Sequence, residues 1–453
     1  MKKVLLYIAS ILFLLIASPV NAELTYPKIY IPGADAYVLM EVESGKILAE
    51  YQSNKQLYPA STTKIITAIL AIENGNMNQE MVASQTAVFD IGKDGMNIGI
   101  QAGEIIKMKD LLNAMLIVSA NEIANILAEN ISGTREEFMK LVNEKAKEIG
   151  AENTNFTNPS GMHQDNHYTT ALDLGKISCY AMRNDIFRSI VKKTSYNMPA
   201  TNKHTSWNTL YTSNILLRNN NFDGYEITGV KSGYTNPAGR CLITSAKNAD
   251  GVELIAVVMG VRSGDTAQTL TNITTDLFKY GFNNFKNIEI IGKNVYLGLI
   301  EPNNARDKQP VVVLAQDDLT VFTLQTVDPE KIEHKINLKE DFKLPVKAGD
   351  VLGEANFYYK NELLGTVNII AGNNVYTDLT VKYNNSSYEN KPVEDSITDG
   401  NETNSNRTDN SQNKKQPVWL LIVKFIIISI SVLILAYITL VLVVITKKKL
   451  KKR

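Results

Sequence analysis

Two pairs of β-strand signals enclose a long helical stretch, and this arrangement constrains the fold more than any other feature. Ala36–Tyr51 contains two strand-forming runs around a turn at Glu43-Ser44-Gly45, and Cys241–Val261 has the same pattern around Asn248–Gly251. Most segments between them have helical periodicity, including DLLNAMLIVSA and EEFMKLVNEKAKEIG. Strands at both ends of a helical middle, without regular strand–helix alternation, predict an α+β domain in which helices flank an antiparallel sheet.

From about Ile288 the pattern changes. Short β-prone runs follow one another, with turn signals such as KAGD between them; they are NVYLGLI, QPVVVLA, LTVFTLQTV and ELLGTVNII. These runs predict a small all-β domain. Residues 384–416 have almost no apolar side chains and therefore predict a disordered, flexible stalk. We accordingly expect an α+β domain over residues 23–283, an all-β domain over 284–383 and a linker over 384–416.

The amino-terminal segment has the layout of a secretory signal peptide. Lys2 and Lys3 precede an apolar run from Val4 to about Ala17, and Val-Asn-Ala precedes Glu23. Residues 1–22 are therefore predicted to be removed by cleavage after Ala22. The alternative is an uncleaved membrane anchor, but the apolar run is short for a segment that crosses a bilayer.

The carboxy-terminal segment predicts a membrane span. Phe425–Ile445 is a run of 21 residues without a charge, which is long enough to cross a bilayer. We place the transmembrane helix within residues 417–446 and a basic tail at 447–453. The positive-inside bias puts this tail in the cytoplasm and everything before the span outside the cell. A buried helix of a soluble domain is the alternative.

Charge and cysteine content narrow the function classes. Lys2, Lys3 and the six cations of the tail account for eight of the 47 basic residues, which leaves 39 against 47 acidic residues, a net charge of −8 outside the membrane. Such a surface does not indicate a nucleic-acid partner. Cys179 and Cys241 are the two cysteines, and they form no C-x-x-C or metal-binding pattern. They could pair or remain thiols.

A serine and a lysine stand three residues apart at the head of a predicted helix, in PASTTKIITAIL. Positions i and i+3 share one helix face, so Ser61 and Lys64 could touch. A partly desolvated lysine can take the proton that makes a serine nucleophilic. Ser61 could equally be a simple helix cap, and S-x-x-K recurs at Ser189 to Lys192.

Two further fragments are ambiguous when each is taken alone. Ser119-Ala120-Asn121 could contribute polar side chains to a site, but Ser119 with Glu122 also fits a helix capping box. GVKSGYTNPAGR leads into the strand at Cys241, and its Lys-Ser-Gly could be no more than a solvated strand end. The order S-x-x-K, S-x-N, K-[ST]-G is nevertheless the signature of the serine penicillin-recognising enzymes.

At this point the sequence resembles the low-molecular-mass penicillin-binding proteins, the D-alanyl-D-alanine carboxypeptidases of the S11 peptidase type. YPASTTKIITAIL is similar to the family segment P-A-S-x-T-K, and VKSGYTNPAGRCLITSA to K-T-G-x-T-x-x-A-G. NTNFTNPSGMHQDNHYTTALDL is similar to the family stretch between the second and third motifs. The region ending LPVKAGDVLGEANFYYKNELLGTVNIIA resembles the family's β-sandwich domain. The resemblance covers roughly Leu24–Val381.

Three positions depart from the family pattern. Ser232 replaces the commoner threonine and keeps the hydroxyl group. Ser160 stands where histidine is frequent, which leaves the roles of His163 and His167 open. A membrane span replaces the amphipathic helix with which some relatives lie on the membrane.

The resemblance implies a role for each matching residue. Ser61 would be the acylated nucleophile, Lys64 its general base, and Ser119 the relay that passes a proton to the leaving D-alanine. Asn121 would hold the substrate amide. The substrate's terminal carboxylate would bind at Lys231, Ser232 and Thr235, and Gly233 would let the peptide approach the strand. The backbone N–H groups of Ser61 and Tyr234 would form the oxyanion hole. Neither a metal nor another cofactor is implied.

The implied reaction is removal of the terminal D-alanine from peptidoglycan stem pentapeptides outside the cell, and β-lactam antibiotics would acylate the same serine. A β-lactamase is one alternative, but the E-x-x-L-N run that holds the hydrolytic water in class A enzymes is missing between Asn121 and Lys231. The other alternative is a penicillin-binding receptor without turnover. The predicted cytoplasmic tail of this chain has seven residues, which is too short to signal alone.

Overall fold

The computed structural model describes residues 26–377, apart from 93–94, 220–221 and 223. Its first domain is built on a five-stranded sheet in the order β2-β1-β9-β8-β7. All neighbouring strands are antiparallel, and the strands are β1 (Ala36–Glu41), β2 (Ile47–Tyr51), β7 (Tyr225–Thr235), β8 (Gly239–Asn248) and β9 (Glu253–Val261). Both predicted hairpins are confirmed, and β7 is an edge strand.

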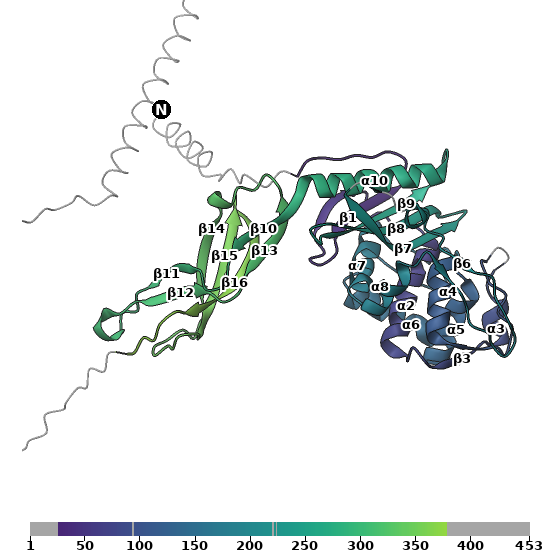
Figure 1. The fold of residues 1–453 in the computed structure, drawn as a ribbon, viewed down its shortest axis with the longest axis horizontal. Coiled ribbons are helices and arrows are strands. Elements are labelled where there is room, and N and C mark those ends of the chain that lie inside the picture. Colours follow the sequence, from purple (N-terminus) through teal and green to yellow (C-terminus); the bar gives the residue numbers. More distant parts are fainter. Residues whose placement is uncertain (1–25, 93–94, 220–221, 223, 378–453) are drawn as a thin grey trace, which may run out of the picture. The chain divides into compact units, whose positions relative to one another are not determined.

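Helices cover both faces of this sheet (Figure 1). Long helix α10 (Thr266–Asn284) lies on one face, against β8 and β9. The other face carries α7 against β1 and β9, and behind it a helical bundle. The helices on this side are α2 (Lys64–Asn74), α3 (Gln85–Phe89), α4 (Met108–Val118), α5 (Asn121–Ser132), α6 (Arg135–Glu148), α7 (Ala171–Met182) and α8 (Asp185–Val191). The α+β architecture predicted for this domain is therefore confirmed.

Alternation along the strands explains why the sheet is covered on both faces. Val38 and Met40 of β1 belong to the apolar cluster under the helical bundle, whereas Tyr37 and Leu39 belong to the cluster under α10. All four side chains are buried. Successive residues of a strand point to opposite faces, so β1 can contribute to two cores only because it is apolar at every one of these positions.

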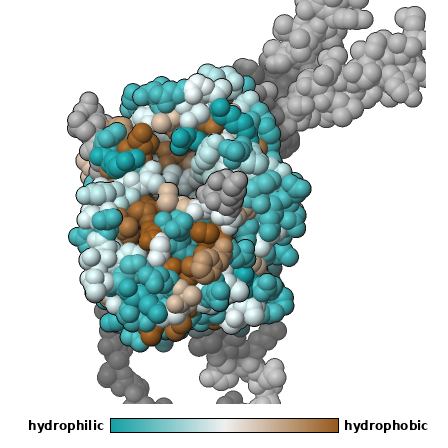
Figure 2. Space-filling model, turned by 90° about the vertical axis from the view of Figure 1, so that its right-hand side faces the viewer, coloured by the Kyte–Doolittle hydropathy of each residue, from teal (hydrophilic) through white to brown (hydrophobic). Residues whose placement is uncertain are grey.

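Short elements complete the domain at its edges. A 3₁₀ turn, η1 (Ala60–Thr63), precedes α2. The short elements also include two small two-stranded antiparallel sheets and one short helix; the sheets are β3 (Glu80–Val82) with β4 (Ile105–Lys107) and β5 (Ser195–Tyr196) with β6 (Leu210–Tyr211), and the helix is α9 (Ile215–Arg218). Large apolar side chains are exposed at several positions, including Phe89, Met96 and Tyr234. Figure 2 shows one face of the molecule on which hydrophobic residues gather within a hydrophilic surround.

The second domain consists of antiparallel β-strands, as predicted. Its five-stranded sheet has the order β11-β12-β16-β15-β14, and a two-stranded sheet pairs β10 with β13. The strands are β10 (Phe285–Ile291), β11 (Tyr296–Ile300), β12 (Val311–Ala315), β13 (Leu319–Leu324), β14 (Glu333–Leu338), β15 (Val351–Tyr359) and β16 (Glu362–Ala371). Val313, Ile369 and Ile291 come from the two sheets and belong to one buried core.

Among the residues that the structure describes, none of the helices combines the length and apolarity needed to cross a membrane. The predicted signal peptide (1–22), stalk (384–416), span (417–446) and basic tail (447–453) lie outside the described residues.

The two cysteines are free thiols buried in separate places. Cys179 lies on α7 with its Sγ near the carbonyl of Glu41, and Cys241 lies on β8 with its Sγ near the carbonyl of Tyr58. Burial raises the pKa of Cys179 to about 12 and that of Cys241 to about 11. A disulfide, which the sequence left open, is therefore absent, and both thiols serve as small apolar groups.

Candidate active site

The serine and lysine of S-x-x-K meet where η1 becomes α2. Ser61 lies in the 3₁₀ turn, whose geometry is held by the hydroxyl of Thr62 donating to the carbonyl of Pro59 (2.7 Å). Lys64 begins α2, and its Nζ donates to Ser61 Oγ at 3.0 Å. Ser61 makes no side-chain cap bond for either helix. The interpretation of Ser61 as a helix cap is therefore wrong, and its hydroxyl faces the lysine instead.

Lys64 is enclosed by hydrogen-bond acceptors. Its side chain is 0% exposed, and Nζ also donates to Asn121 Oδ1 (2.7 Å) and to the carbonyl of Ser160 (2.5 Å). Burial lowers the pKa of Lys64 well below its usual value, the nearby charge of Lys231 lowers it further, and Glu122 acts in the opposite direction. Such an amine is neutral for a larger fraction of the time than an exposed lysine and can accept a proton.

The second motif lies at the junction of α4 and α5. Ser119 follows the last residue of α4 in a left-handed conformation (φ 73°, ψ 26°), and Asn121 is the first residue of α5. Ser119 Oγ is buried and, among the described residues, lacks a hydrogen-bond partner. The capping box, the alternative interpretation of Ser119 and Glu122, does not form, because the residue before α5 is Ala120 and it has no side-chain cap bond.

The third motif lies on edge strand β7, directly beside η1. Lys231 is 1% exposed, its Nζ donates to the carbonyl of Ser232 at 2.8 Å, and burial lowers its pKa to about 7. Gly233 packs so closely on η1 that a Cβ there would stand 3.0 Å from the backbone nitrogen of Ser61. A larger residue at position 233 would push strand β7 away from the turn η1.

Ser213 is a member of the site that the sequence did not reveal. Its Oγ lies 2.7 Å from Ser232 Oγ, and its backbone N–H donates to the carbonyl of Ile117 near the end of α4. Ser213 therefore links the end of α4, which precedes Ser119, to strand β7, which carries the Lys-Ser-Gly motif. It lies in a segment between β6 and α9, far from all three motifs in sequence, and no local pattern distinguishes it.

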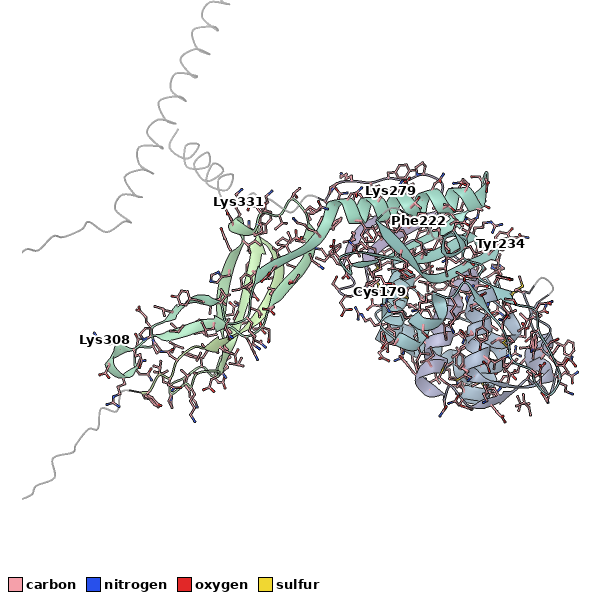
Figure 3. All side chains as sticks on the ribbon, in the orientation of Figure 1. Cys179, Phe222, Tyr234, Lys279, Lys308 and Lys331 are labelled. Atoms are coloured by element: carbon pink, nitrogen blue, oxygen red, sulfur yellow. The ribbon has the colours of Figure 1, made fainter. Side chains whose placement is uncertain are left out.

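Tyr234 and Thr235 end β7. Tyr234 is 57% exposed, and Figure 3 shows it at the end of the sheet. Its hydroxyl donates to Asn236 Oδ1 (2.7 Å), and the guanidinium of Arg240 lies over its ring. Thr235 Oγ1 accepts the N–H of Ala238 (3.2 Å) within the turn that follows. Among the predicted carboxylate-binding groups, the hydroxyl of Ser232 lies next to that of Ser213, whereas the side chain of Lys231 is buried.

The two histidines whose roles were open differ in their surroundings. His167 is buried, accepts the N–H of Thr157 at Nδ1 (3.0 Å) and therefore carries its proton on Nε2, 2.9 Å from Thr63 Oγ1. It thus fixes the turn that carries Ser61. His163 is partly exposed and packs edge-on against Tyr58. Among the described residues, neither histidine is hydrogen-bonded to the side chain of Ser61.

The second S-x-x-K pair forms no site. Ser189 lies on α8, and its hydroxyl donates to the carbonyl of Ile186 within the same helix. Among the described residues, no hydrogen bond joins Ser189 to Lys192, in contrast to Ser61 and Lys64. The structure therefore distinguishes the two pairs that the sequence presented alike.

Two family models match the chain. The D-alanyl-D-alanine carboxypeptidase model of peptidase family S11 matches residues 27–263, and the model of the penicillin-binding protein 5 C-terminal domain matches residues 285–377. The first match alone covers more than half of the chain. The chain belongs to the S11 D-alanyl-D-alanine carboxypeptidase family. Its second domain is the β domain that accompanies the catalytic domain in penicillin-binding protein 5.

Relatives of this S11 protein cover most of its length. D-alanyl-D-alanine carboxypeptidase DacF of Bacillus subtilis is 30% identical over 328 residues, which is 71% of this chain and 80% of the relative. DacA of Haemophilus influenzae is 27% identical, over 76% of this chain and 85% of the relative. The crystal structure of penicillin-binding protein 5 from Haemophilus influenzae matches with a TM-score of 0.63 and 24% identity, over 78% of this chain and 100% of that chain. This last likeness establishes the fold.

We predict that His167 makes the stability of this S11 protein depend on pH. Burial lowers the pKa of His167 from 6.5 to about 4, so its neutral form stabilises the folded state above pH 6.5. That contribution, up to about 3 kcal/mol, is lost as the pH falls from 6.5 to 4, because the unfolded chain takes up the proton first. His167→Gln should therefore be less stable than wild type in urea unfolding at pH 7, with a gap that narrows at pH 4.5.

His334→Gln is the control for the His167 experiment, because His334 is exposed on strand β14 of the second domain and is not among the groups that shift the pKa of His167. It should retain the pH dependence of the wild type. A stability difference between His167→Gln and wild type that stays constant from pH 7 to pH 4.5 would contradict the assignment.

Proposed function

We propose that this chain removes the terminal D-alanine from peptidoglycan stem pentapeptides through an acyl-enzyme on Ser61, and that β-lactams acylate the same residue. The observation that carries this proposal is the contact between a fully buried lysine amine and the hydroxyl of Ser61, at 3.0 Å. The S11 family match and the relatives named D-alanyl-D-alanine carboxypeptidase support the same reaction. A serine peptidase of this kind works without a histidine base.

In the acylation step, Lys64 takes the hydroxyl proton of Ser61 while the serine oxygen bonds to the carbonyl carbon of the penultimate D-alanine. The carbonyl oxygen becomes an oxyanion, for which we assign the backbone N–H groups of Ser61 and Tyr234 as donors. The close approach of Gly233 to the backbone nitrogen of Ser61 supports this assignment, because it brings the two backbones to the same place. Donors fixed before the reaction stabilise the developing charge without reorganisation.

Collapse of the tetrahedral intermediate breaks the bond to the leaving D-alanine, whose amine must receive a proton. Ser119 is suited to relay this proton from Lys64, because its hydroxyl is buried and uncommitted to another described group. Asn121, already bonded to Lys64, presents its side-chain N–H₂ group for the carbonyl of the substrate amide. Water then releases the shortened peptide from Ser61.

The substrate is expected to lie along β7. This strand is the last of its sheet, so an extended peptide can add to it at the Lys-Ser-Gly motif by backbone hydrogen bonds. The terminal carboxylate would then reach Ser232 and Thr235, and its negative charge would favour the protonated form of the buried Lys231 amine. Ser213 joins this set because its hydroxyl lies 2.7 Å from that of Ser232, and two such hydroxyls can each donate to one carboxylate oxygen.

Our first functional prediction concerns turnover. Wild-type protein should release D-alanine from a stem pentapeptide, and Ser61→Ala should release none. Lys64→Arg keeps the positive charge but holds its proton, so its acylation rate should fall by roughly 100- to 10,000-fold while the protein stays folded. D-alanine is measured enzymatically, and folding by circular dichroism. Acylation by penicillin without any D-alanine release from the wild type would favour the receptor alternative.

The second functional prediction concerns Ser213. Loss of one hydrogen bond to a carboxylate weakens binding by about 1.5–3 kcal/mol, so Ser213→Ala should raise KM for the pentapeptide by roughly tenfold or more and change kcat less. A pentapeptide with an amidated terminus lacks the carboxylate, and its hydrolysis should be equally slow with either enzyme. Steady-state kinetics on both peptides measure the difference.

Ser189→Ala is the matched control for Ser213→Ala, since Ser189 bonds only within its own helix. Its kinetic constants should equal those of the wild type. An unchanged KM in Ser213→Ala, or the same loss on both peptides, would remove Ser213 from the carboxylate site.

We also propose the topology that the termini suggest. The catalytic domain (23–283) and the β domain (284–383), a sandwich in the family, would lie outside the cell, joined by the 384–416 linker to a membrane span within 417–446 and a cytoplasmic tail at 447–453. The charge-free run Phe425–Ile445 followed by six cations supports this arrangement. Peptidoglycan, the proposed substrate, lies on the same side of the membrane.

The third functional prediction tests this topology by fractionation. The full chain should sediment with membranes, whereas a chain ending at Tyr383 should be soluble after signal cleavage and still bind labelled penicillin. A truncated chain that still sediments with membranes would place the anchor elsewhere. A soluble but inactive one would show that the linker belongs to the fold, contrary to its composition.

A further inference from the structure

Glu122 is a buried carboxyl group near the proposed base that the mechanism above does not use. It lies in the first turn of α5 and is 1% exposed. Its Oε1 accepts the backbone N–H of Ile98 at 2.7 Å. Its Oε2 is buried and, within the described part of the chain, lacks a hydrogen-bond partner. A buried, unpartnered carboxylate oxygen is destabilising, so its presence calls for a compensating interaction.

The position of Glu122 connects it to the reacting groups. It directly follows Asn121, whose Oδ1 accepts Lys64 Nζ at 2.7 Å and whose N–H donates to the carbonyl of Met96, also at 2.7 Å. Helices α5 and α2 pack on each other, and Glu122 is joined to Asn121, which bonds to Lys64, so the two charged groups are close enough to interact. Glu122 and Lys64 thus belong to one buried cluster.

We propose that Glu122 is a positioning residue whose carboxylate stabilises Lys64 in the protonated form that arises when the amine has taken the proton of Ser61. The proposal rests on the proposed function, in which the Ser61 oxygen bonds to the substrate carbonyl carbon as its proton moves to Lys64 Nζ. That transfer creates an ammonium ion in a buried site. A buried charge without a counter-charge is strongly disfavoured, and Glu122 supplies the opposite sign.

The other charged groups near this cluster make a counter-charge more important. Lys231 on β7 acts on Lys64 with the same sign and disfavours its protonation. His167 is neutral near pH 7, because burial, His163 and Lys64 all lower its pKa. Burial raises the pKa of Glu122, while three backbone N–H groups and Lys64 lower it, so the carboxylate and the ammonium stabilise each other. Protonation of Lys64 and ionisation of Glu122 are therefore linked.

The experiment is the pH dependence of acylation in the full-length protein, followed with labelled penicillin between pH 5 and 10. Glu122→Gln keeps an oxygen for the N–H of Ile98 but removes the charge. The protonated form of Lys64 should then be less stable, so the acidic limb of the profile should move down by about one pH unit. The rate on the plateau should fall roughly two- to fivefold, because the base is weaker.

Glu104→Gln is the matched control. Glu104 is 0% exposed and accepts the N–H of Gln101 (2.8 Å), but it bonds to His204 and Thr201 rather than to the Lys64 cluster. Its substitution removes a buried charge of the same kind elsewhere in the domain. The acidic limb of Glu104→Gln should coincide with that of the wild type even if its thermal stability is lower.

The proposal would be overturned if the acidic limb of Glu122→Gln coincided with that of the wild type, or if the rate fell equally at every pH. Glu122 would then serve only to support residues 95–98. Should Glu122→Gln not fold, Glu122→Asp decides, because it withdraws the charge by about one carbon–carbon bond and must move the limb in the same direction by less. Absence of wild-type labelling would instead refute the proposed function, so the two failures are distinguishable.

Discussion

Burial of the Lys64 amine is the constraint on which the rest of this active site depends. An exposed lysine is protonated near neutral pH and offers Ser61 no base. At 0% exposure, with acceptors at Ser61, Asn121 and Ser160, the amine is desolvated but still oriented by hydrogen bonds. The same desolvation disfavours the protonated form of Lys64. The positive charge of Lys231 lowers the pKa of Lys64 further, and the negative charge of Glu122 raises it.

The fold meets this constraint by joining segments that are far apart in the sequence. The turn η1 and helix α2 supply Ser61 and Lys64, the α4–α5 junction supplies Ser119 and Asn121, and edge strand β7 supplies the Lys-Ser-Gly motif. His167 and the carbonyl of Ser160 come from a fourth segment, which has little regular structure. The sheet and the helical bundle bring these four segments together, and donors must keep fixed positions if they are to stabilise a developing charge without reorganisation.

Elements with local signals were predictable from the sequence. Both hairpins followed from alternation and turn residues, and the α+β arrangement followed from their placement around the helices. Residues 59–70 and 229–240 were identified by motif spacing, and the structure brings Ser61, Lys64 and Asn121 into direct contact. The hydroxyl oxygen of Ser119 and the side chain of Lys231 are also buried, and the roles assigned to them are proposals. These features depend on short-range patterns, which a sequence displays directly.

The remaining features depend on long-range contacts or on competition between local alternatives. Ser213 belongs to the site only because its segment crosses from α4 to β7, and nothing near it in the sequence indicates this. Glu122 fitted a capping box, but a backbone N–H from residue 98 competes successfully for its carboxylate. Cys179 and Cys241 could have paired, but α7 and β8 bury them next to different carbonyl groups.

The central claim is that Ser61, activated by buried Lys64, is the residue that becomes acylated. Peptide mapping by mass spectrometry after brief exposure of the native protein to penicillin tests this most directly. The account predicts one penicilloyl group per chain, carried by the peptide that contains Ser61. A penicilloyl group on Ser189 or on any residue outside the Ser61 peptide would contradict it.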